Sequence, residues 1–153
     1  MLPPGILDPG GISIADPASS KKRVLEHAAR LLAVGLGEEP TAEQIFERLL
    51  ERERLGSTGL AGGVALPHAR IGGIAQSRGA FMRLASPVEF DALDGQPVDL
   101  VFALLVPADA NEEHLQLLAR LAGLFNNADL RTRLREVDAE GALVTLTGGG
   151  DAA

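Results

Sequence analysis

Two of the three histidines lie where an imidazole can do chemistry. His68 follows a short apolar run and a proline, directly after a glycine-rich loop at 56–63. A residue before proline avoids the helical region, so the chain reaches His68 extended, and strand ends deliver side chains to sites in α/β sheets. His114 lies near the start of an expected helix, whose unpaired N–H groups attract anions such as phosphate. Two neutral imidazoles near such a helix end and loop are suited to holding a phosphoryl group.

Each histidine also has an ordinary interpretation. A lone histidine is usually a surface or hydrogen-bonded residue without a special function. We interpret His27, which lies on an amphipathic helix, in this way. The same alternative stays open for His68. His114 has glutamates beside it and fits an exposed helix start. A zinc site would combine the pair with Glu113 or Asp109, but the two histidines are far apart and show no HxxxH spacing. We therefore expect no metal.

The glycine-rich loop lacks the signatures of other chemistries. No lysine follows it, as a nucleotide-binding P-loop requires, and it does not match GxGxxG and precedes a strand instead of following one. Ser57 lacks the GxSxG turn of a nucleophilic serine, so a turn-forming role is the better interpretation. We expect neither a nucleotide nor any other cofactor.

Composition narrows the class of protein. The chain has 153 residues, which fits one domain, and it has no cysteine, which excludes a disulfide framework and a thiolate nucleophile. A formal charge of -7 argues against nucleic acid as the main partner, because phosphate backbones bind basic faces. No apolar run approaches the roughly 18 residues of a membrane span, and the N-terminus does not resemble a signal peptide. We expect a cytoplasmic α/β domain without membrane insertion.

The pattern of apolar residues, caps and turns predicts the elements around the two histidines. An edge strand over Gly11–Ala15 belongs to a lead-in at 1–18. The first helix begins at Ser19 or Ser20, and Thr41 and Gln44 form the capping box of a second helix that ends near Leu55. Strands are expected at 64–66, 80–84 and 98–106, the last of them buried on both faces.

The C-terminal third is expected to be helical. Asn111 caps a third helix whose inward side is Leu115, Leu118 and either Leu121 or Ala122. A fourth helix spans about 127–137, the segment at 140–146 is interpreted as helix, and the tail at 148–153 is expected to be frayed.

Acidic residues concentrate between Arg83 and Arg120, where the chain has no lysine or arginine. They are Glu89, Asp91, Asp94, Asp99, Asp109, Glu112 and Glu113. Most are expected in loops near the start of the His114 helix. They form either a solvated acidic face or a docking rim for a basic partner protein.

Several segments, taken in order, carry a family pattern. They are Ser19-Ser20-Lys21-Lys22; Leu55-Gly56-Ser57-Thr58-Gly59 leading to Val64-Ala65-Leu66-Pro67-His68; Phe90 to Leu100; Leu104 to Asp109; and His114-Leu115. In this register the chain resembles a phosphotransferase-system (PTS) enzyme IIA of the fructose/mannitol type, and it is most similar to the nitrogen-regulatory branch. The match runs from roughly 6 to 147, and its most specific part is 51–118.

The resemblance implies the fold and the site. The fold would be a single-domain α/β structure with a mixed β-sheet flanked by helices, over 19–147, with a flexible tail at 148–153. His68 would be the phospho-acceptor, His114 its partner in the site, and Arg52 a phosphate-facing arginine at the end of the second helix. Ser57, Thr58 and Gly59 would support the phosphate or the loop. The sequence departs from the family at Ala61 and Gly62, where glycine and asparagine are common, and at Ala69-Arg70 in place of Gly-Lys.

The implied function is phosphate transfer between histidines. A phosphocarrier protein of the HPr or NPr type would phosphorylate His68, and the phosphorylation state would control regulatory target proteins. Two alternatives stay open: a sugar-specific IIA component that passes phosphate to a IIB domain, and an interaction module whose histidines are structural. Whether it is a regulator or a sugar-specific IIA component, the chain would be a phosphotransferase component that needs no cofactor.

Overall fold

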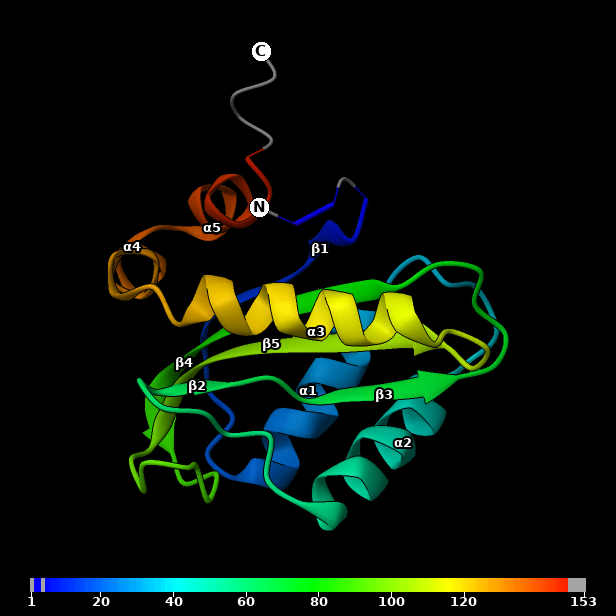
Figure 1. Cartoon of the computed structure of the whole chain (residues 1–153), viewed down its shortest axis with the longest axis horizontal. Coiled ribbons are helices and arrows are strands. Elements are labelled where there is room, and N and C mark those ends of the chain that lie inside the picture. Colours follow the sequence, from blue (N-terminus) through cyan, green and yellow to red (C-terminus); the bar gives the residue numbers. More distant parts are fainter. Residues whose placement is uncertain (1, 4, 149–153) are drawn as a thin grey trace.

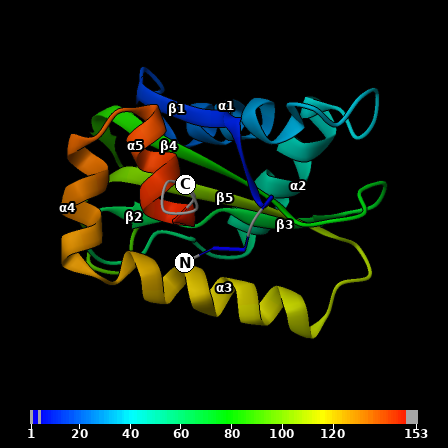
Figure 2. The ribbon, with the colours of Figure 1, turned by 90° about the horizontal axis from the view of Figure 1, so that it is seen from above.

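A five-stranded mixed sheet forms the middle layer of the protein, and helices cover both of its faces (Figures 1 and 2). The computed structural model describes residues 2–3 and 5–148. The elements are β1 (Leu7–Asp16), α1 (Lys21–Ala33), α2 (Ala42–Leu55), β2 (Val64–Ala65), β3 (His68–Ile71), β4 (Arg78–Val88), β5 (Val98–Pro107), α3 (Glu112–Phe125), α4 (Ala128–Glu136) and α5 (Ala139–Thr147). The α/β architecture predicted from the sequence is confirmed.

The sheet combines parallel and antiparallel pairs in the order β1-β4-β5-β2, with β3 also on β5. β1 runs parallel to β4 at one edge, and β4 runs antiparallel to β5. β2 and β3 both run parallel to β5 and follow one another along it, opposite Leu100–Val101 and Leu104–Pro107 respectively. β2 and β3 thus form the second edge of the sheet together, with a break between Ala65 and His68.

Local capping chemistry sets most helix starts. The Ser20 hydroxyl accepts from the N–H of Arg23 at 3.2 Å, and Thr41 and Gln44 make both hydrogen bonds of a capping box, so both predicted caps are confirmed. The predicted cap at Asn111 is wrong. Asn111 precedes α3, but its backbone (φ -120°, ψ -90°) is not in the extended region typical of a cap, and its side chain makes no capping hydrogen bond.

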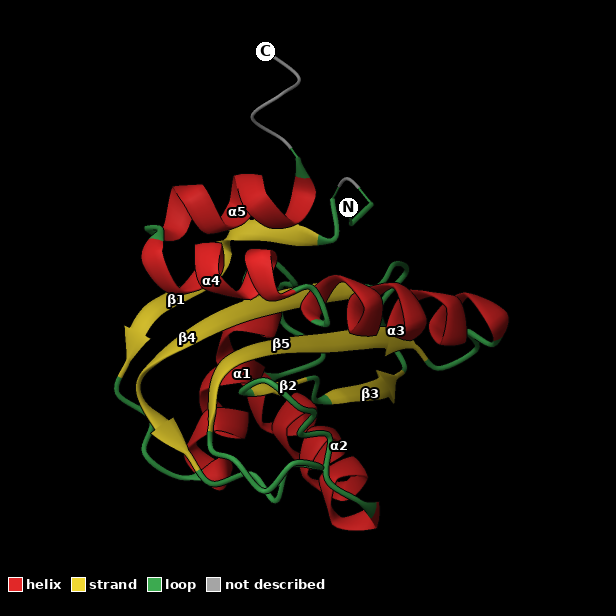
Figure 3. Ribbon diagram, turned by 60° about the vertical axis from the view of Figure 1, so that its left-hand side comes forward, coloured by secondary structure: helices red, strands yellow, loops and turns green. Residues whose placement is uncertain are grey.

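Two hydrophobic clusters separate the helices into layers. α1 and α2 pack on one face of the sheet, and α3, α4 and α5 pack on the other, as Figure 3 shows. β5 contributes to both clusters, which confirms the prediction that it is buried on both faces. It is therefore the central support for whatever lies at the strand ends.

The inward side of α3 differs from the one predicted. Leu115 is exposed, and the buried residues are His114, Leu121 and Phe125, with Leu118 packed against them. These four are spaced by four, three and four residues, which is one face of a helix. Leu115 is one position off that face, about 100° around the helix. The orientation of α3 about its own axis therefore places His114 on the buried face of the helix.

The strand at 64–66 was predicted to end at Pro67-His68, but pairing with β5 resumes at His68 and forms β3. Residues 68–71 have two charged or polar side chains in four, so no apolar run announces a strand there. β1 and β4 are also longer than predicted, while the helix expected at 140–146 is confirmed as α5. Residues 149–153 of the expected tail lie outside the described residues. Within residues 2–3 and 5–148, no helix is both long and apolar enough to cross a bilayer.

Asp16, at the end of β1, predicts how stability depends on pH. Burial raises the pKa of its carboxyl, but hydrogen bonds from the Ala18 N–H (2.9 Å), the Ser13 hydroxyl (2.8 Å) and the His27 ring (2.7 Å) outweigh burial and hold the pKa below its ordinary value. A lowered native pKa contributes stability above the unfolded pKa, and this stability is lost as the pH falls through the native value. Asp16→Asn should therefore lose less stability than the wild type between pH 6 and pH 3 in urea unfolding. Equal losses would contradict this assignment.

Candidate functional site

The interruption in the edge of the sheet places His68. Pro67 has no N–H for the sheet, and its carbonyl accepts from the N–H of Leu104 at 2.9 Å, which holds the chain in line as β3 begins. Leu66 lies between β2 and β3, and its carbonyl oxygen is 2.8 Å from Nδ1 of His68. A carbonyl can only accept, so Nδ1 carries the proton. The lone pair of the half-buried His68 ring is therefore on Nε2.

His114 reaches His68 from α3, which packs on the face of the sheet opposite to α2. Its position near the start of α3 brings the two ring centroids to 5.6 Å, with the ring planes at 78°. Figure 3 shows the arrangement, with β3 at the edge of the sheet, α2 below it and α3 above. The Nε of Arg70 lies 3.2 Å from Nδ1 of His114. His114 is buried, so the exposed helix start considered from the sequence is wrong.

Both imidazoles are held in the neutral form near pH 7. Burial is the main cause of the lowered pKa of His68, and the positive charge of Arg52 adds to it, while the Leu66 carbonyl and Glu53 act in the opposite direction. Burial also lowers the pKa of His114, with further contributions from His68 and Arg70. A neutral ring keeps a lone pair, which a nucleophile needs.

The two rings line a cavity of about 630 Å³ between α2, β3 and α3. Its walls also carry Arg52 and three further arginines, which are Arg48, Arg54 and Arg70; Glu51 is the acidic residue among the lining side chains. Arg52 donates to the carbonyl of Gly56 at 2.8 Å, which holds its guanidinium at the end of α2. The structure thus brings together the three residues that the sequence singled out: His68, His114 and Arg52.

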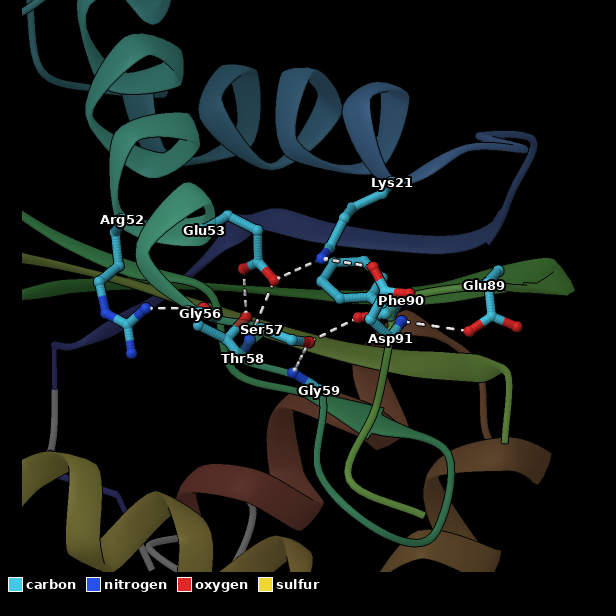
Figure 4. Close-up of polar contacts among 10 residues, drawn as sticks. All are labelled: Lys21, Arg52, Glu53, Gly56, Ser57, Thr58, Gly59, Glu89, Phe90 and Asp91. Atoms are coloured by element: carbon cyan, nitrogen blue, oxygen red, sulfur yellow. Dashed lines mark hydrogen bonds and ion pairs between the residues drawn. The ribbon is translucent and has the colours of Figure 1, made fainter. Parts of the chain in front are cut away.

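The predicted supporting residues of the loop make hydrogen bonds within it. Ser57 donates to the carbonyl of Phe90 at 2.5 Å and accepts from the N–H of Gly59 at 3.0 Å. Thr58 is buried and donates both its N–H (2.9 Å) and its hydroxyl (2.6 Å) to the Glu53 carboxylate (Figure 4). These contacts support the loop. A phosphate contact through the N–H groups of Thr58 and Gly59 would require both to leave their present partners.

Glu53 anchors this loop to the first helix. Its carboxylate is 2.8 Å from Nζ of Lys21, whose ammonium lies 5.0 Å from the centre of the Phe90 ring (Figure 4). One buried carboxylate therefore joins the end of α2, the loop and the start of α1. Because Arg52 is its neighbour in sequence and holds Gly56, this network also sets the position of the guanidinium.

The acidic stretch does not surround the cavity as the sequence suggested. None of its seven residues lines the cavity, whose walls are rich in arginine. Asp91 lies beside Lys21, Asp94 accepts from the N–H of Gly62, and Asp99 pairs with Arg135. Asp109, Glu112 and Glu113 remain exposed around the start of α3. The two segments of the stretch are separated because β5 carries the chain across the sheet between them.

Sequence reasoning missed two residues of the site, Arg70 and Glu53. Side chains alternate along a strand, so an extended segment through Ile71 would have placed Arg70 on the same side as His68. Glu53 has no comparable signal, since a glutamate in a charged helix normally faces solvent. Within the described part of the chain, no group of three histidine, aspartate or glutamate side chains is arranged to hold a metal ion.

Comparisons with known proteins identify the family of this chain. Residues 5–146 match the family described as "Phosphoenolpyruvate-dependent sugar phosphotransferase system, EIIA 2". A nitrogen regulatory protein of Pseudomonas aeruginosa is 51% identical over 141 residues, which cover 92% of this chain and 91% of that protein.

Two solved structures show the same fold. The crystal structure of nitrogen regulatory protein IIA-Ntr from Neisseria meningitidis has a TM-score of 0.86 and 45% identity, covering 93% of this chain and 97% of that one. Enzyme IIAMTL of Escherichia coli, solved in complex with phosphorylated enzyme IIBMTL, has a TM-score of 0.74 and 21% identity, covering 91% and 95%. The sequence resemblance is thereby confirmed, and the chain belongs to the EIIA 2 family of the phosphoenolpyruvate-dependent sugar phosphotransferase system.

Proposed function

We propose that this chain is a nitrogen-regulatory IIA protein that accepts a phosphoryl group on Nε2 of His68 from a phosphohistidine carrier protein of the HPr or NPr type. The observation that carries the proposal is the hydrogen bond between Nδ1 of His68 and the Leu66 carbonyl. It leaves a neutral ring with its lone pair on Nε2, in a cavity lined by His114 and arginines.

The transfer balances without a metal, a nucleotide or an external base. The lone pair of Nε2 forms the new N–P bond, while the N–P bond to the carrier breaks and its electron pair stays on the carrier's imidazole. His68 keeps the proton on Nδ1 and becomes positively charged as the bond forms. The Leu66 carbonyl accepts from this N–H, and a hydrogen bond from a charged donor is stronger than one from a neutral donor. The same contact thus orients the ring and stabilises the product.

Arg52 and His114 are the groups we propose for the charge on the phosphoryl oxygens. Charge is spread over three equatorial oxygens in the transition state, and catalysis is mostly a matter of position and electrostatics. A guanidinium suits this task because it is always charged and donates in a planar fork. Glycines in the loop let a partner's backbone approach closely.

Phosphorylation would change the charge of the site and so its partners. A phosphoryl group adds roughly two negative charges at neutral pH. Added to a cavity lined by four arginines and one glutamate, these charges offset much of its positive charge. We propose that regulatory target proteins in the cytoplasm distinguish the two states in this way.

The relatives favour regulation over sugar uptake. The similar proteins of Pseudomonas aeruginosa and Neisseria meningitidis are both named nitrogen regulatory proteins. The Escherichia coli enzyme IIAMTL was solved with a phosphorylated IIB partner, which supports a IIB domain as the alternative acceptor of phosphate. Incubating the labelled protein with a panel of IIB domains distinguishes the two, since a regulator should pass label to none of them.

The direct experiment is phosphate transfer from a phosphorylated carrier. The wild-type chain should gain the mass of one phosphoryl group when it is mixed with the phosphorylated carrier of the same organism. A IIA protein labelled in parallel serves as the positive control. If only the control is labelled, the chain is an interaction module and the proposal is wrong.

His114→Ala and Arg52→Ala should each slow labelling without abolishing it. Each side chain assists through charge or a hydrogen bond, and loss of one such donor slows a reaction by roughly 100-fold. Rapid-quench measurement of the phosphorylated fraction gives the rates. Wild-type rates in both variants would contradict the roles assigned to them.

A further inference from the structure

Arg70 has no role in the function proposed above, although its side chain reaches the second imidazole of the site. It follows His68 by two residues in β3, and Ala69 and Ile71 between and after them are buried in the core. Alternation along the strand therefore directs His68 and Arg70 to the same side. Arg70 lines the same cavity as both histidines.

The hydrogen bond from Arg70 determines which nitrogen of His114 can carry a proton. Arginine has donors and no acceptor, and it stays charged at any ordinary pH. Since Nε of Arg70 is 3.2 Å from Nδ1 of His114, Nδ1 must be the acceptor. The one proton of the neutral His114 ring is then on Nε2. This is the opposite tautomer to His68, whose proton is on Nδ1.

The Nε2 atom of His114 is an exception among buried polar groups. It is buried and has no hydrogen-bond partner among the described residues. Buried donors are almost always paired, so an unpaired one calls for an explanation. The explanation is a partner that is present only during the reaction, because a phosphoryl oxygen on His68 can accept a hydrogen bond from this N–H. The rings are close enough for such contact, with centroids 5.6 Å apart.

We infer that Arg70 is a positioning residue, which donates to Nδ1 of His114 and thereby makes Nε2 of that ring the hydrogen-bond donor to a phosphoryl group on His68. The inference rests on the proposed transfer to His68 and deepens it. Arg70 acts through His114, whereas Arg52 acts on the phosphoryl group itself.

The first test is the tautomer of His114. Two-bond ¹H–¹⁵N correlation spectra of the wild-type protein at pH 7.5 should show His114 with its proton on Nε2 and His68 with its proton on Nδ1. In Arg70→Met, the Nδ1 signal of His114 should move to a less shielded position, because its donor is lost. A wild-type His114 with its proton on Nδ1 would overturn the inference and leave phosphate transfer to His68 untouched.

The second test is a double-mutant cycle on the rate of labelling by the phosphorylated carrier. Arg70→Met should slow labelling by about tenfold, and Arg70→Lys should restore most of the rate because lysine is again a donor. If Arg70 acts through His114, the double variant Arg70→Met/His114→Ala is no slower than His114→Ala alone. Losses that multiply would mean that Arg70 contacts the phosphoryl group directly, and the inference would be wrong.

Arg133→Met is the matched control for lost charge. Arg133 lies exposed on α4 and does not line the cavity, and the change removes the same guanidinium. It should label at the wild-type rate. An equal loss in this control would mean that net charge, not the contact with His114, explains the effect of Arg70→Met. Absence of label in the wild-type protein would instead refute the proposed function, so the two failures are distinguishable.

Discussion

His68→Ala is expected to take up no phosphate from a phosphorylated carrier under conditions that label the wild-type chain completely. Among residues 2–3 and 5–148, the alanine removes the only group that has both a lone pair fixed on Nε2 and a place beside Arg52 in the cavity. His114 does not replace it, because its Nδ1 is engaged by Arg70 and its Nε2 is protonated and buried. Intact-protein mass spectrometry measures the uptake.

The control for this loss is His27→Ala, which makes the same change outside the cavity. His27 pairs with Asp16 at 2.7 Å, as a hydrogen-bonded structural histidine does, and this confirms the ordinary interpretation of that residue. The variant should therefore be labelled like the wild type. Residual label in His68→Ala at the stoichiometry of one phosphate per chain would show that the acceptor is another residue.

Glu53→Ala should have the largest effect on stability. Glu53 is 7% exposed, accepts two hydrogen bonds from Thr58 and forms an ion pair with Lys21. Its removal leaves the buried N–H and hydroxyl of Thr58 without their acceptor. Lys21 is a quarter exposed and regains water, which lowers the cost. We expect a loss of roughly 2–3 kcal/mol in the free energy of unfolding, measured by urea denaturation.

Two further variants separate this network from a general effect of charge. Glu47→Ala makes the same change at an exposed position of α2 and should shift stability by less than about 0.5 kcal/mol. Glu53→Gln keeps an oxygen for Thr58 and loses the charge that faces Lys21, so its cost should be intermediate. If Glu53→Ala were as stable as Glu47→Ala, the loop at 56–59 would not depend on this carboxylate.

Local signals in the sequence predicted much of the fold. Ser20 and the Thr41–Gln44 pair are correct caps because a cap is decided by residues within one turn. The apolar run of β5 is informative for a similar reason, since burial on both faces requires nearly every side chain to be apolar. Pro67 is also a local constraint and explains the break after β2, but the structure places His68 at the start of β3 and not after the last residue of a strand.

The parts that sequence reasoning missed depend on partners far away in the chain. β3 forms because β5 offers free pairing groups beyond the break at Pro67, and nothing in the composition of 68–71 indicates this. Arg70 and His114 are neighbours only once β3 and α3 lie beside each other. The interior position of Glu53 likewise depends on Lys21, which lies on another helix.

The charge around the site shows the same limit. An acidic stretch in the sequence suggested an acidic rim, but one wall of the cavity is formed by the last turns of α2. Residues four positions apart in a helix lie on the same face. Arg48 and Arg52 share such a face. The charge of a linear segment is therefore a poor guide to the charge of a site assembled from three elements.

The most direct test of the account is the identity of the nitrogen that carries the phosphoryl group. Protein labelled with ¹⁵N and phosphorylated by the carrier should show ³¹P–¹⁵N coupling, and the corresponding shift change, at Nε2 of His68, with the proton still on Nδ1. A phosphoryl group on Nδ1 of His68, or on either nitrogen of His114, would contradict the account, because the Leu66 carbonyl leaves only Nε2 of His68 free to attack.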